Sequence, residues 1–173
     1  DKFGWLSGEW IRRETPERLA DECAPFVVAA GQLTERDLVL RRAWFVDVVR
    51  GMQERLRTYA ELPEKIAFLF AADDAVEWEE SAAKNAAKHL GAAQRARLAP
   101  RLEAGGVDPE AVREFTKTWI SERELKMPQL FQPLRAALSG QSGGPDLFAI
   151  MSWLGAESTL ARIDSGIARL AAG

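Results

Sequence analysis

Apolar residues recur every three or four positions along most of the chain, a spacing typical of helices that bury one face. The clearest case follows Thr34, where an apolar stripe has successive spacings of seven, four, three and four residues. The stripe consists of Leu38, Phe45, Val49, Met52 and Leu56. No run alternates apolar and polar residues long enough to predict a strand. The pattern therefore predicts an all-α protein, which we expect to contain two helical subdomains.

Capping residues predict the helices of the first part. Thr15 before Pro16 indicates a helix start with proline in its first position, and Gly31 should end that helix. Thr34 is a good N-cap for one long helix that carries the whole stripe, and a short helix should follow from about Leu62. The residues we expect to be buried here are Trp44, Phe45, Met52, Phe68 and Leu69, with Ile66 and Phe70 beside them.

At residues 71–74 an apolar run gives way to an acidic, alanine-rich one, which predicts a boundary between subdomains 1–72 and 73–173. In the second subdomain Asp108 should cap a helix that has proline in its first position. Another helix should be regular only beyond Pro133 and end at Gly140. The remaining helices are expected at about 75–90, 92–103, 145–154 and 157–171, around a core that includes Phe115, Trp119, Leu134 and Leu138.

Composition narrows the setting of the protein. The chain has 173 residues, 47% of them apolar, so it can fill a core. Its one cysteine, Cys23, excludes an internal disulfide framework and, among apolar neighbours, is best explained as a small buried hydrophobe. No segment reaches the roughly 20 apolar residues of a membrane span, and no leader resembles a signal peptide. We therefore expect a cytoplasmic protein that does not bind a membrane.

A net charge of −3 is not the bias of a protein that coats nucleic acid non-specifically, so DNA is not an expected partner. Recognition of one folded RNA needs only a local basic face, and five arginines could supply it: Arg41, Arg42, Arg50, Arg55 and Arg57. The alternative is a solvated helix face with intrahelical ion pairs, and by itself this pattern favours the alternative.

The sequence contains little that could support catalysis. His89 is the only histidine, and neither a nucleophile motif nor a glycine-rich nucleotide-binding motif is present. One histidine and one cysteine also make a zinc site improbable. We expect neither a catalytic residue nor a metal site in this chain.

Three segments, in the same order, resemble the bacterial-type glutamyl-tRNA synthetases. The run LFQPLRAALSG, residues 130–140, is similar to the family's FQPLRxALTG string in the anticodon-binding part, and it is followed by Pro145, Leu147 and Phe148, which match P-x-L-F. The start, KFGWLSGEWIR, is similar to K-x-x-W-x-N-G-x-Y-I-R, and RLRTYAELPEKIAFLF, residues 55–70, resembles the segment that runs into E-L/F-P-E. Because the family pattern is already under way at Asp1, we expect the chain to be a piece of a longer protein.

This resemblance implies the C-terminal anticodon-binding helical array of a class I glutamate–tRNA ligase, with glutamate tRNA as partner. ATP and Mg²⁺ would belong to the catalytic domain, whose H-I-G-H-like and K-M-S-K-S-like motifs are absent here. The chain alone should therefore be inactive in aminoacylation and hold no cofactor. We expect it to be a monomer.

The resemblance also assigns roles to six residues. Arg55 matches the arginine that reads the third anticodon base, and Arg135 matches the one that contacts the first base. A guanidinium offers only donors, which suit the O2 and N3 acceptors of cytosine and oppose the donors of guanine. Gly144 stands where the family often has threonine, so only backbone groups there could read the middle base. Pro145, Leu147 and Phe148 would form an apolar ledge for the first two bases.

For two of these residues the sequence leaves another explanation open. Arg55 could form an ion pair with Glu54 or Glu61, and Phe148 could belong to the core through a face it shares with Met151 and Leu154. For the whole chain, the alternative function is a helical protein-interaction module with no role in RNA binding. A broad exposed apolar patch would favour that alternative.

Overall fold

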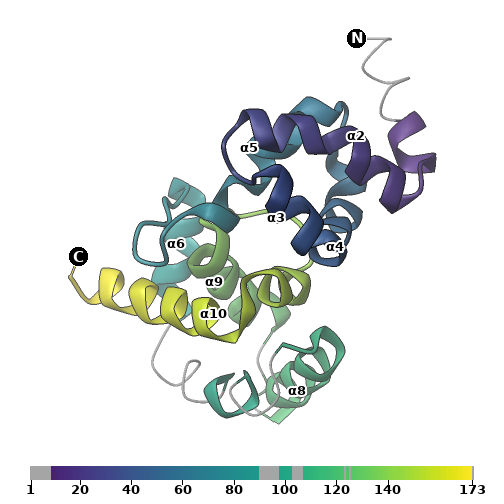
Figure 1. Ribbon diagram of the computed structural model, residues 1–173. Coiled ribbons are helices and arrows are strands. Elements are labelled where there is room, and N and C mark those ends of the chain that lie inside the picture. Colours follow the sequence, from purple (N-terminus) through teal and green to yellow (C-terminus); the bar gives the residue numbers. More distant parts are fainter. Residues whose placement is uncertain (1–8, 90–97, 103–106, 123, 125, 173) are drawn as a thin grey trace. The chain divides into compact units, whose positions relative to one another are not determined.

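A computed structural model describes residues 9–89, 98–102, 107–122, 124 and 126–172 (Figure 1). These residues form α-helices and short 3₁₀ helices joined by turns, and no strand occurs among them. The all-α prediction is confirmed. The chain divides into two compact units, Asp1–Phe70 and Ala71–Gly173. Among the described residues, no helix has the length and apolar character needed to cross a membrane, and no group of three metal-ligating side chains comes together.

The first unit is built on α2 (Pro16–Ala29), which packs against α4 (Arg42–Met52). The other elements are α3 (Glu35–Leu40), η1 (Gln53–Arg55), η2 (Tyr59–Glu61), α5 (Leu62–Ile66) and η3 (Ala67–Phe70). Thr15 caps α2 through a bond from the Arg18 N–H, and Thr34 forms a reciprocal capping box with Asp37. The helix starts read from the sequence are therefore confirmed.

The prediction of one long helix after Thr34 is wrong, because the backbone leaves the helical region at Arg41 (φ −113°, ψ 26°). The Arg41 guanidinium lies over the Trp44 ring, 3.9 Å from its centroid, and Arg42 pairs with Asp21 of α2 at 2.7 Å. Helix α4, which begins directly after this break, packs on α2. The α-helix then ends at Met52, and a 3₁₀ turn follows.

The core of the first unit lies between α2 and α4, where Leu19, Cys23, Val27, Phe45, Val49 and Met52 are all buried. The prediction of burial is confirmed for Phe45, Met52 and Phe68. It is wrong for Trp44, Leu69 and Phe70, which are half-buried. The Trp44 ring meets Phe70 edge to face at 6.3 Å, so it covers the margin of the core rather than filling it.

The second unit contains α6 (Glu80–His89), α8 (Pro109–Glu122), α9 (Met127–Ser139) and α10 (Leu147–Ala172), and residues 98–102 are also helical. Helix α9 packs against both α6 and α10 (Figure 1). Where α6 and α9 meet, Ala82, Ala86 and Ala136 let the helices approach closely. As expected, Asp108 caps α8, and Gly155 (φ 82°, ψ 171°) interrupts the last helix.

Three expectations for the second unit need correction. Residues 75–79 are not helical, and α9 begins at Met127 rather than beyond Pro133. A proline costs a helix one N–H and crowds the preceding turn, but the rest of α9 keeps its packing, so the helix continues through Pro133. Phe115 is half-buried, whereas Trp119, Leu134 and Leu138 are buried as predicted. Parts of the helices expected at 75–90 and 92–103 lie outside the described residues.

A buried arginine joins the start of this unit to its last helix. Arg162 of α10 is 2% exposed, and its Nε donates to Asp73 at 2.8 Å. Its two terminal nitrogens donate to the carbonyl oxygens of Leu138, at 2.7 Å, and Ala71, at 2.9 Å. The buried guanidinium therefore has hydrogen-bond partners in two backbone carbonyls and one partly exposed carboxylate.

Candidate nucleic-acid interface

The loop between α9 and α10 begins at Gly140, whose left-handed conformation (φ 72°, ψ 0°) ends α9. A Cβ on Gly140 would lie 1.8 Å from the carbonyl oxygen of Glu77, so no other residue fits without movement. This close approach lets the Glu79 N–H donate to the Gly140 carbonyl at 2.8 Å. The extended segment before α6 is thus bound along the start of the loop.

The loop is anchored a second time at Ser142. Its backbone N–H and its hydroxyl both donate to Glu79 Oε2, at 3.0 and 2.9 Å. These two bonds lower the pKa of the Glu79 carboxyl, because they favour its charged form. The loop is therefore held by an acidic side chain from a segment 63 residues away.

Arg135 lies beneath the far end of the loop. It is half-buried, and its Nη1 donates to the carbonyl oxygen of Pro145 at 2.6 Å. Gly144 has φ 140°, and a Cβ there would lie 3.3 Å from both Arg135 Nη1 and Gln141 Oε1. In this loop conformation both the backbone angle and the space favour glycine where the resembling family often has threonine. The structure therefore brings Arg135, Gly144 and Pro145 together.

The other two residues of the expected ledge are part of the core. Leu147 and Phe148 are each 1% exposed, and Pro145 is also buried. The Phe148 ring meets the Phe131 ring edge to face at 5.5 Å. An exposed apolar ledge is therefore wrong for this structure, because the first turn of α10 directs these side chains inward. The alternative assignment of Phe148 to the core is confirmed.

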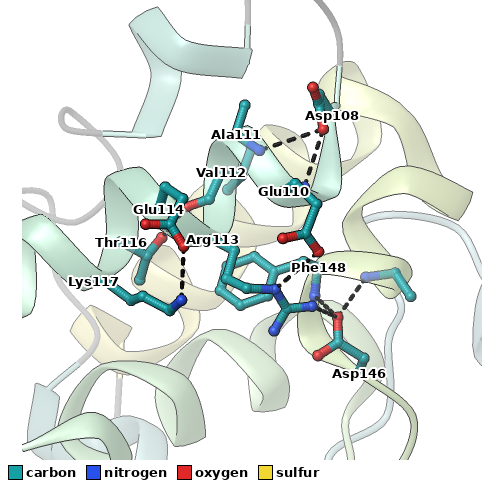
Figure 2. A network of polar contacts seen from close by, with 11 residues as sticks. Asp108, Glu110, Ala111, Val112, Arg113, Glu114, Thr116, Lys117, Asp146 and Phe148 are labelled. Atoms are coloured by element: carbon teal, nitrogen blue, oxygen red, sulfur yellow. Dashed lines mark hydrogen bonds and ion pairs between the residues drawn. The ribbon is translucent and has the colours of Figure 1, made fainter.

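Asp146 separates these buried residues and caps α10. Its Oδ1 accepts from the N–H groups of Phe148 and Ala149, both at 3.1 Å, and from Arg113 Nη2 of α8 at 3.0 Å (Figure 2). The Arg113 guanidinium lies 4.6 Å from the centroid of the Phe148 ring. Burial alone would lower the pKa of Arg113, but Asp146 and then Glu110 outweigh it, so the pKa is raised.

Arg55 lies in the first unit, at the end of η1, and it is exposed. Because α4 stops at Met52, the position of Arg55 is set by the 3₁₀ turn and not by the helical stripe. Glu54 pairs with Arg12 at 3.5 Å, and Glu61 accepts from the backbone N–H of Arg57 at 3.0 Å. Both proposed partners of Arg55 thus have contacts with other residues.

The basic face expected from the sequence is partly committed to other contacts. Arg41 stacks on Trp44, Arg42 pairs with Asp21, and Arg50 pairs with Asp47 of the same helix at 3.3 Å. Intrahelical pairing, the alternative interpretation, is therefore confirmed for Arg50. Arg55 and Arg57 are exposed on the segment that follows.

Glu79, Arg113 and Asp146 were not among the site residues predicted from the sequence. An aspartate directly before the helical pattern of residues 147–154 could have been recognised as an N-cap. Glu79 and Arg113 carry no local signal, because their partners lie 63 and 33 residues away.

The described residues thus form an all-helical fold in which Arg135 is bonded to the backbone of a loop that contains Gly144. Residues 18–167 match the family described as anticodon binding domain. Since the match covers most of the chain, the protein belongs to that family.

The curated relatives are consistent with this assignment. The chain is 35% identical over 170 residues to a glutamate–tRNA ligase of Thermus thermophilus, and 34% identical over 170 residues to one of Oleidesulfovibrio alaskensis. These alignments cover 97% of this chain but 34% and 35% of the relatives. The chain therefore spans about a third of the length of the relatives it matches.

Among solved structures, the fold is similar to a crystal structure of a glutamate tRNA ligase from Elizabethkingia meningosepticum in complex with its amino acid. The TM-score is 0.82 at 21% identity, with 96% of this chain and 32% of that chain covered. At 21% sequence identity, this structural similarity shows a shared fold and nothing further.

Proposed function

We propose that this chain is the C-terminal anticodon-recognising part of a glutamate–tRNA ligase. The observation that carries the proposal is Arg135 bonded at 2.6 Å beneath the loop at Gly144–Pro145, within a chain of the anticodon binding domain family. The names and coverage of the curated relatives support the same assignment. Residues 73–173 would contact the first two anticodon bases, and residues 1–72 would adjoin the catalytic part.

In this proposal the anticodon bases leave their stack, and the protein contacts their Watson–Crick edges. Arg135 would donate to the first base, either beside its bond to Pro145 or in exchange for it. Gly144 has no side chain, so backbone groups of the loop would contact the middle base. With Leu147 and Phe148 buried, the two residues act by holding the loop in shape rather than by stacking on bases.

Arg55 would read the third base, which is C in glutamate anticodons and G in glutamine anticodons. Its donors match the acceptors of cytosine and would face donors on guanine, leaving both sides unpaired. Each bidentate contact of this kind is worth roughly 1–3 kcal/mol of discrimination, taking base readout in DNA as a guide.

Aminoacylation would belong to the complete ligase, a class I enzyme that uses ATP and Mg²⁺ in its catalytic domain. This chain would supply tRNA recognition only. We expect the ligase to act as a monomer in the cytoplasm.

The test is to measure, by fluorescence anisotropy, the Kd of this chain for labelled anticodon stem-loops whose third anticodon base is C or G. Arg55→Gln should narrow the preference for the C hairpin by roughly tenfold or more, because an amide can pair with either base. Arg135→Ala should weaken the binding of both hairpins to the same degree, since the two hairpins share their first two anticodon bases.

Arg36→Gln is a matched control, because Arg36 is an exposed arginine of the same unit and the substitution removes the same charge. It should leave the ratio between the hairpins unchanged. If the wild-type chain binds neither hairpin above a scrambled RNA, the anticodon function is wrong, and a protein-interaction module becomes the better explanation.

A further inference from the structure

Reading a middle base with backbone groups requires that the backbone be fixed within about half an ångström. The loop has anchors at Gly140 and Ser142 on the side of Glu79. The segment from Gly144 to Leu147 lies at the other end, and its position depends on what holds the start of α10.

Arg113 of α8 contacts that start at two points. Its Nη2 pairs with Asp146 Oδ1 at 3.0 Å, the same oxygen that accepts the N–H groups of the first turn of α10. Its guanidinium also lies over the Phe148 ring, 4.6 Å from the centroid (Figure 2). One planar cation therefore binds both the capping carboxylate and an aromatic ring two residues later.

The guanidinium is itself oriented from its own helix. Glu110, three residues earlier in α8, accepts from Arg113 Nε at 3.3 Å. With Glu110 on one edge, Asp146 on another and Phe148 against one face, the group has a defined plane. The Arg113 side chain is 31% exposed, so it does not fill the centre of the core.

We propose that Arg113 is a positioning residue for anticodon reading, which holds Asp146 and Phe148 so that the backbone of Gly144–Leu147 keeps the geometry needed to contact the middle base. The proposal rests on the proposed function. It assigns α8 an indirect part in base discrimination, and Arg113 need not touch RNA. An aspartate at 146 is then required for its charge as well as for its capping oxygen.

The decisive variant is Arg113→Met, which keeps an unbranched apolar side chain near Phe148 but removes the guanidinium. We expect the ratio of Kd values between hairpins with A and with U in the middle position to fall by roughly threefold to tenfold. Arg113→Lys should not restore the ratio, because an ammonium cannot stack in a plane and pair at its edge together. Asp146→Asn, which keeps a capping oxygen, should lower the ratio in the same direction.

Lys117→Met is the matched control on the same helix. Lys117 is exposed and pairs with Glu114, three residues earlier, as Arg113 pairs with Glu110. Its replacement by methionine removes the same positive charge. Any loss of affinity that it causes should be equal for both hairpins, so the ratio should stay at the wild-type value.

A second measurement needs no RNA. Amide hydrogen exchange at Phe148 and Ala149 should speed up in Arg113→Met relative to Lys117→Met, because their acceptor at Asp146 loses its support. An unchanged ratio in Arg113→Met, or unchanged exchange at these two amides, would overturn the positioning role. If wild type does not distinguish the hairpins, the proposed function fails, and exchange still decides whether Arg113 orders the loop.

Discussion

Replacing Gly140 with alanine should damage the protein more than any ordinary substitution of a helix-ending glycine. Gly140 has φ 72°, and the added Cβ would lie 1.8 Å from the Glu77 carbonyl oxygen and 3.3 Å from Val76 Cγ1. Backbone cannot yield as a flexible side chain can, so the loop and the segment before α6 must separate.

The magnitude has two parts. A left-handed conformation costs a residue with a Cβ about 1–2 kcal/mol, partly offset by about 0.4–1 kcal/mol because alanine restricts the unfolded chain. Separation of the two segments also breaks the bond from the Glu79 N–H to the Gly140 carbonyl, now 2.8 Å, which costs about 1–3 kcal/mol if its groups stay buried. We expect Gly140→Ala to lower the free energy of unfolding of the second unit by about 2–4 kcal/mol.

Gly31 is the control, because it also has a positive φ, 70°, but a Cβ there meets nothing within 4 Å. Gly31→Ala should cost about 1 kcal/mol, the conformational part alone. Native-state hydrogen exchange measures the free energy of opening of each unit separately. Equal losses in the two variants, within about 0.5 kcal/mol, would refute the argument that the Glu77 contact determines the residue at 140.

Three further outcomes are expected. Arg162→Met should destabilise the second unit by about 3–5 kcal/mol in urea unfolding, because it leaves Asp73 and two backbone carbonyls without the buried guanidinium; a loss under about 1 kcal/mol would contradict this. Burial and the nearby charge of Glu22 raise the pKa of the Cys23 thiol from 9.0 to about 12, so the folded state favours the neutral thiol. The contribution of this neutral thiol to the free energy of unfolding should be complete below pH 9 and lost between about pH 9 and 12, and Cys23→Ala should remove that part of the alkaline unfolding transition. The lowered pKa of Glu79 has the opposite sign: the contribution of its carboxylate to stability is present above the ordinary carboxyl pKa and is lost as pH falls through the lowered value. The protection factor of the Ser142 amide, measured against an unfolded peptide at the same pH, should therefore fall in acid in wild type and should be low at every pH in Glu79→Gln.

Sequence alone was sufficient for the helical class and for the features governed by neighbouring residues. Thr34 and Asp37 form their capping box three residues apart, and Asp108 caps the helix that follows it directly. Gly140 ends α9 where the motif LFQPLRAALSG predicts. The same motif supported the family assignment, because a run of specific residues is informative before any fold is known.

Tertiary structure decided the features that depend on distant partners. The helix break at Arg41 accompanies packing against α2, and the burial of Phe148 depends on Arg113 and on Phe131 of α9. The two acidic anchors of the loop, Glu79 and Asp146, acquire their roles from chain segments brought together by folding.

The physical reason is the range of the interactions. Caps and helical stripes join residues a few positions apart, so their geometry is set by the local backbone and can be read from spacing. The choice of a partner 33 or 63 residues away depends on how whole helices pack, and many exposed acids and arginines of this chain would satisfy the same chemistry. The sequence therefore determined which elements form, and only the packed structure determined which charges hold the loop.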